Sequence, residues 1–140
     1  MDLVTLKEKM DQQNYVYDDT MATVLAVALQ LGRPLLIEGA AGVGKTEIAK
    51  VLAKVLDRDL VRLQCYEGLD EGKALYEWNY QKQLLSIQVN MGTADSDTLT
   101  RSLFSDEYLL ERPLLQSIRS EKPVVLLIDE IDKADEEFEA

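Results

Sequence analysis

Histidine is absent from this 140-residue sequence, and Cys65 is its single cysteine. Without histidine, a Ser-His-Asp triad, a zinc site of the HExxH type and any catalysis by imidazole are excluded. One cysteine cannot form an internal disulfide, which excludes the small disulfide-stabilised scaffolds. Cys65 closes an apolar strand pattern, so we expect it to be a small buried hydrophobic residue rather than a reactive thiol.

Positive charge is also scarce. The chain has 15 Lys and Arg against 26 Asp and Glu, a net charge of −11. We therefore expect no binding to nucleic acid or to an anionic membrane surface through its overall field. No stretch approaches the roughly 20 apolar residues of a membrane helix, and the start has no basic region typical of a signal peptide. With 46% hydrophobic residues, the composition predicts one soluble, cytoplasmic domain.

Apolar periodicity predicts alternating helices and strands. A capping box at Thr5 and Glu8 favours a first helix within residues 1–14, and Asp18 or Asp19 should cap the second, which ends at Gly32. Pro113 suits the first turn of a later helix. The remaining elements are expected as strands at 35–38, 60–65 and 124–128, helices at 45–56 and from about 134, and a locally disordered loop at 90–98. This pattern predicts an α/β fold with a mainly parallel sheet flanked by helices.

A glycine-rich motif lies between the first expected strand and the helix at 45–56. It matches the phosphate-binding pattern G-x-x-x-x-G-K-S/T, with Gly39, Ala40, Ala41, Gly42, Val43, Gly44, Lys45 and Thr46. Such a loop points backbone N–H groups at phosphate oxygens. Lys45 would reach the β- and γ-phosphates and the Thr46 hydroxyl would bind Mg²⁺. The alternative is a glycine-rich turn with a purely structural role.

A second motif follows the strongest strand pattern, residues 124–128. Asp129 would hold Mg²⁺ through its water shell, and Glu130 would activate the attacking water as general base. Taken alone, this pair could be two solvated acids after a buried strand. Together and in this order, the two motifs predict a P-loop site for ATP and Mg²⁺. The DxxG and NKxD motifs of P-loop GTPases do not occur, and Glu130 disfavours a small-molecule kinase.

With these motifs the sequence resembles the AAA+ ATPases, specifically the MoxR group and, within it, the CoxD-like branch. The likeness runs from about Tyr15 to the end of the chain. It is carried by residues 34–46, 62–70, 74–80, 111–115 and 126–135. The resemblance implies ATP hydrolysis, assembly with other copies into a ring expected to be hexameric, and a chaperone that remodels a client protein. In the CoxD-like branch, such remodelling serves the maturation of metal-cofactor enzymes.

The resemblance also implies roles for aromatic residues. Tyr15 and Val16 correspond to the segment that lies near adenine, although packing of a connector explains them equally well. An insert at about 67–80 would face the pore or the client and would make Tyr76, Trp78 and Tyr80 client contacts. Packing against the sheet is at least as good an explanation for these three aromatics.

The chain is shorter than an AAA+ module. We expect residues 1–140 to be the N-terminal part of one ATPase domain that lacks the sensor strand, the arginine finger and the helical lid, so that the fold is incomplete on its C-terminal side. Little or no ATPase activity is then expected of the chain alone, because an arginine finger contributes about 10³–10⁵ to the rate. The alternative function is a nucleotide-binding or interaction fragment without turnover.

Overall fold

The computed structural model describes residues 1–40, 44–92 and 95–140, and only the backbone of Tyr76, Glu77, Trp78 and Asp106. The chain divides into two units. The first unit comprises residues 1–62 and 121–127, and the second comprises residues 63–120 and 128–140.

Helices α1 (Leu3–Gln12), α2 (Asp19–Leu31) and α3 (Lys45–Val55) belong to the first unit. Helix α1 begins one turn earlier than the capping box predicts, because the Asp2 carboxylate accepts a 2.8 Å hydrogen bond from the Thr5 N–H. The prediction that Thr5 is the cap was therefore wrong: an aspartate three residues upstream is an equally good N-cap.

Helix α2 has the predicted ends. The Asp18 side chain accepts from the Met21 N–H, and Gly32 ends the helix in the left-handed region with φ 61°. A left-handed residue after the last turn satisfies helix carbonyls at little cost when that residue is glycine. Helix α3 likewise covers the range expected from its apolar stripe.

The core of the first unit forms where α1, α2 and α3 meet. Its buried members are Leu6, Met10, Leu25, Ala26, Ile48, Val51 and Val55. Leu35 and Ile37 pack against this core, as their apolar character predicts, but no strand is assigned to residues 35–38. The strand prediction was wrong because a strand needs a hydrogen-bonded neighbour, and no other described segment pairs with this one.

Strands β1 (Leu60–Gln64) and β4 (Val125–Asp129) pair with each other. In the first unit the Val125 N–H donates to the Asp59 carbonyl, and in the second the Cys65 N–H donates to the Asp129 carbonyl, both at 2.9 Å. Because the contacts advance in the same direction along both strands, the pair is parallel. Both strands match their predictions within a residue or so.

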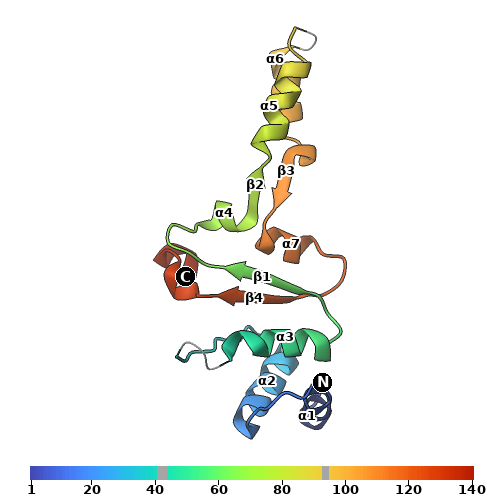
Figure 1. Cartoon of the computed structure of the whole chain (residues 1–140), viewed down its shortest axis with the longest axis vertical. Coiled ribbons are helices and arrows are strands. Elements are labelled where there is room, and N and C mark those ends of the chain that lie inside the picture. Colours follow the sequence, from blue (N-terminus) through green and yellow to red (C-terminus); the bar gives the residue numbers. More distant parts are fainter. Residues whose placement is uncertain (41–43, 93–94) are drawn as a thin grey trace. The chain divides into compact units, whose positions relative to one another are not determined.

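The second unit contains a segment that the sequence pattern did not resolve. Strands β2 (Tyr76–Trp78) and β3 (Leu109–Glu111) pair antiparallel, with Tyr76 opposite Glu111. Between them lie α5 (Tyr80–Val89), α6 (Ser96–Leu103) and the 3₁₀ turn η1 (Asp106–Tyr108), and α5 and α6 pack side by side (Figure 1). Helix α6 replaces the end of the loop expected at 90–98, whose residues 93–94 lie outside the described chain.

The other elements of this unit are short. They are α4 (Glu71–Leu75), α7 (Pro113–Arg119), η2 (Ile131–Lys133) and α8 (Glu136–Glu139). Pro113 occupies the first turn of α7, as predicted. The buried residues of this unit's core are Leu63, Cys65, Leu69, Ala74 and Ala134. Among the described helices of both units, none has the length and apolar character needed to cross a membrane.

Candidate nucleotide site

The N-terminus of α3 is the best-defined part of the candidate site. Gly44 is its N-cap, with φ 85° and ψ 19°, and no described side chain caps the helix. A Cβ at this position would meet nothing within 4 Å, so the left-handed backbone, not lack of space, favours glycine here. The first-turn N–H groups form the positive end of the helix dipole, and among them the Glu47 N–H donates to the Gly44 carbonyl at 3.1 Å.

Lys45 connects the two ends of the glycine-rich motif. Its Nζ donates a hydrogen bond to the Gly39 carbonyl, which places the ammonium group on the loop side of α3. Thr46 follows in the first turn of the helix. Gly39 and Ala40 are exposed, whereas Ala41, Gly42 and Val43 lie outside the described residues. A helix N-terminus without a described side-chain cap, next to a lysine that reaches the Gly39 carbonyl, fits a phosphate group and its Mg²⁺.

The segment expected near adenine lies in the same unit. Tyr15 packs against the core that includes Ile48 of α3. Its ring stacks on Tyr17 at 6.4 Å between centroids and 18° between planes. Burial raises the pKa of Tyr15, and the negative charges of Glu47 and Asp18 raise it further. Glu47 is in the first turn of α3.

Val16 has a different environment from its two neighbours. Its exposed fraction is 93%, although it lies between two tyrosines that both pack against the core. The structure thus separates the roles within this segment: the tyrosines fix its position, and Val16 is presented to solvent.

The two acids predicted to serve hydrolysis lie in the second unit. Asp129 is the last residue of β4, and Glu130 follows it with φ 56° and ψ 45°. A left-handed conformation is uncommon for a residue other than Gly, Asn or Asp. Glu130 Oε2 forms a 2.8 Å ion pair with Lys133 Nζ, and both side chains are partly exposed. The hydrogen bond with Glu130 raises the pKa of Lys133.

Cys65 is adjacent to these acids but is not a candidate nucleophile. Its side chain is 2% exposed. Burial raises the pKa of its thiol, and the charges of Asp129, Asp132 and Glu130 raise it further. A thiol in this environment remains protonated near neutral pH and is a poor nucleophile. The expectation of a buried hydrophobic cysteine is confirmed. In the part of the chain that the structure describes, no cluster of three or more His, Cys, Asp or Glu could hold a metal by itself.

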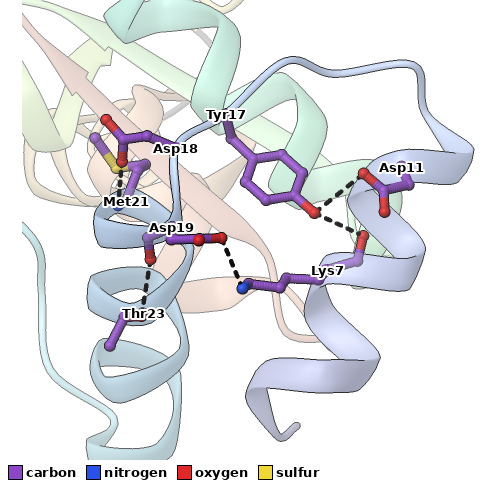
Figure 2. A network of polar contacts seen from close by, with 7 residues as sticks. All are labelled: Lys7, Asp11, Tyr17, Asp18, Asp19, Met21 and Thr23. Atoms are coloured by element: carbon purple, nitrogen blue, oxygen red, sulfur yellow. Dashed lines mark hydrogen bonds and ion pairs between the residues drawn. The ribbon is translucent and has the colours of Figure 1, made fainter.

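The charged site residues were predicted from the sequence, but two contacts near the candidate site residues were not. The ion pair between Glu130 and Lys133 has the i, i+3 spacing and opposite charges that could have predicted it. The contacts of the Tyr17 hydroxyl with Asp11 and with the Lys7 carbonyl in α1 (Figure 2) had no comparable sequence signal. Tyr80 is exposed, and the side chains of Tyr76 and Trp78 are outside the description.

Together, these features define an α/β protein with a glycine-rich loop that leads into a helix N-terminus. The model of the AAA family, ATPases associated with various cellular activities, matches residues 35–138. The match covers well over half of the chain, so this protein belongs to the AAA family of ATPases. Neither the curated proteins nor the solved structures gave a significant match.

Proposed function

We propose that this chain binds MgATP at residues 39–46 and contributes the residues that hydrolyse it. The observation that carries the proposal is the N-terminus of α3, where Gly44 is left-handed, no described side chain caps the helix, and Lys45 reaches back to the Gly39 carbonyl. Membership of the AAA family supports ATP as the nucleotide.

In this proposal each residue has one task. The first-turn N–H groups of α3 and the Lys45 ammonium bind phosphate oxygens. The Thr46 hydroxyl and the Asp129 carboxylate would hold Mg²⁺. When bound, this ion would supply charge stabilisation at the phosphates. Glu130 orients the attacking water and accepts its proton.

At the level of the assembly, we propose a MoxR-like ATPase, with the CoxD-like branch as the nearest likeness. Other copies would complete each site in a ring, with a hexamer as the expected size. Hydrolysis would drive the remodelling of a client protein, and a metalloenzyme under maturation is the proposed class of client. The single buried thiol is compatible with a cytoplasmic location.

A second candidate function is nucleotide binding without turnover by this chain. The ion pair between Glu130 and Lys133 favours it, because a carboxylate oxygen held by an ammonium group is turned to that partner rather than to an attacking water. Such a chain would join or cap a ring and leave hydrolysis to other subunits.

Single-turnover hydrolysis of radiolabelled ATP, with the protein in excess over nucleotide, separates the two functions. If Glu130 is the general base, wild type converts ATP to ADP at the low rate expected of the chain alone, and Glu130→Gln retains bound ATP with a rate at least about 100-fold lower again. The matched control is Glu137→Gln, at an exposed acid on α8, which should hydrolyse at the wild-type rate.

The outcomes are distinct. Equal and negligible hydrolysis by wild type and Glu130→Gln, with intact ATP binding, supports the function without turnover. Measurable hydrolysis that Glu130→Gln does not slow would contradict the role of Glu130. Loss of binding in Glu130→Gln would contradict the division of tasks between the phosphate loop and the base.

A further inference from the structure

The turn that follows β4 brings Lys133 back onto Glu130 at two points. The Lys133 N–H donates to the Glu130 carbonyl at 3.0 Å, and the Lys133 ammonium forms the 2.8 Å ion pair with Glu130 Oε2. The backbone contact belongs to the 3₁₀ turn η2. The side-chain contact engages the carboxylate that is proposed to activate water.

This turn has anchors besides the ion pair. Ala134 is 9% exposed and belongs to the core of the second unit, and Ile131 packs against that core. The Ala134 N–H donates to the Ile131 carbonyl at 3.1 Å. By contrast, the side chains of Lys133 and Glu130 are 57% and 44% exposed, and an exposed ion pair adds little to stability. The ion pair is therefore a small part of what holds the turn.

The effect of the ion pair on the carboxylate is direct. A general base must lie within hydrogen-bond reach of the water whose proton it accepts. The Lys133 ammonium occupies Glu130 Oε2, so a water has to compete with a charged donor for that oxygen. Breaking the pair frees the oxygen and leaves the other anchors of the turn in place.

We infer that Lys133 is an autoinhibitory latch on Glu130: the ion pair is a closed state of the general base, and hydrolysis proceeds from the open state in which the pair is broken. This inference rests on the proposed function and deepens it, because it adds a control on Glu130 within the same turn. Since both partners are partly exposed, the closed state is favoured only a few-fold, and the latch opens readily.

Single-turnover hydrolysis with all of the MgATP bound tests the latch, because differences in nucleotide affinity then do not enter the rate. Lys133→Met keeps an aliphatic side chain and the backbone N–H but removes the charge. We expect this variant to hydrolyse ATP roughly 3- to 6-fold faster than wild type, the range that loss of an exposed ion pair allows. Lys133→Arg keeps a cation that can reach the carboxylate and should remain close to the wild-type rate.

Two further variants assign the effect to Glu130. In the Glu130→Gln background, Lys133→Met should give no acceleration, because no carboxylate remains to be released. The matched control is Lys50→Met, which breaks another ion pair of i, i+3 spacing, with Glu47 at 3.5 Å and both partners 55% exposed. It should leave the rate unchanged. Circular dichroism and the urea midpoint of each variant identify any loss of folded protein.

Salt provides a readout that needs no substitution. Raising potassium chloride from about 0.1 M to about 1 M screens exposed ion pairs. With the bound fraction of nucleotide measured alongside, the rate of wild type should rise toward that of Lys133→Met, and the rate of Lys133→Met should not rise.

The outcomes separate the latch from the proposed function. Faster hydrolysis by Lys133→Met that is absent in the Glu130→Gln background supports the inference. A rate equal to that of wild type or below it overturns the inference, as does an acceleration that persists in the Glu130→Gln background or that Lys50→Met shares. Each of these results leaves the proposed function intact if wild type binds MgATP and Glu130→Gln slows hydrolysis. A wild-type chain that does not bind MgATP overturns the proposed function together with the inference.

Discussion

At the scale of single residues, the site depends on a few backbone conformations. Gly44 and Glu130 both adopt positive φ, at the start of α3 and directly after β4. Glycine adopts this region without strain, whereas glutamate does so only where its surroundings hold it there. The ion pair with Lys133 is one such constraint on Glu130.

The conformation of Gly44 leads to a prediction about stability and binding. Gly44→Ala should lower the free energy of unfolding by about 1 kcal/mol, because alanine is strained at φ 85°. It should also weaken MgATP binding, because relief of that strain moves the first-turn N–H groups. Urea denaturation and calorimetry measure the two effects.

The matched control is Gly72→Ala in α4. Gly72 has no positive φ, and an added Cβ would lie 3.6 Å from the Asp70 carboxylate, an ordinary contact. Alanine favours a helix more than glycine does, so this variant should be at least as stable as wild type. An equal loss of stability in both variants would contradict the conformational explanation for Gly44.

At the scale of elements, local signals predicted some helices well and the strands unevenly. Caps and apolar stripes act within a few residues, so α2, α3 and α7 could be located from sequence, with Gly32 and Pro113 as markers. Strand β1 was predictable because its apolar and polar residues alternate, and its burial follows that alternation. Strand β4 was predictable because it is a continuous apolar run. Residues 35–38 have a similar apolar run, yet pairing with a distant segment decides whether such a run becomes a strand.

The arm formed by β2, α5, α6 and β3 had no clear sequence signal. Its strands are three residues long, too short for a recognisable period. Its helices meet through a polar contact, since the buried Gln83 side chain donates a 2.6 Å hydrogen bond to the Leu103 carbonyl. Leu103 ends α6, where carbonyl groups lack partners within the helix. A polar residue with this role cannot be recognised from apolar periodicity.

This contact gives a prediction for the arm. Gln83→Ala should loosen α6 from α5 by about 1–2 kcal/mol, because the Leu103 carbonyl loses its side-chain donor. Hydrogen exchange should become faster at the amides of α6 and remain unchanged in α1, α2 and α3. Gln81→Ala, at an exposed position of α5, is the control. Uniform acceleration throughout the chain would show that Gln83 supports the whole fold rather than the arm.

At the scale of the whole molecule, the candidate residues fall into two groups. The phosphate loop, Tyr15 and Val16 belong to the first unit, and Asp129 and Glu130 belong to the second. The sequence order of the two motifs was enough to predict a nucleotide site, because each motif has its own local pattern. The contacts of the Tyr17 hydroxyl with Asp11 and with the Lys7 carbonyl could not be predicted, because they join residues brought together by the packing of α1 and α2.

The net charge of −11 applies to the molecule as a whole and opposes anionic ligands at long range. A triphosphate must therefore be held by local groups, the α3 N-terminus and Lys45, and not by the overall field. Removal of one local cation should consequently have a large effect, whereas removal of another lysine on the same helix should have a small one.

Calorimetric titration of the chain with MgATP, beside Lys45→Ala and the control Lys54→Ala, is the most direct test of the central claim. The account predicts saturable one-site binding, a loss of at least about tenfold in affinity for Lys45→Ala, and a nearly unchanged affinity for Lys54→Ala. Absence of binding by folded wild-type chain, or equal affinities in wild type and Lys45→Ala, would contradict a phosphate site at residues 39–46.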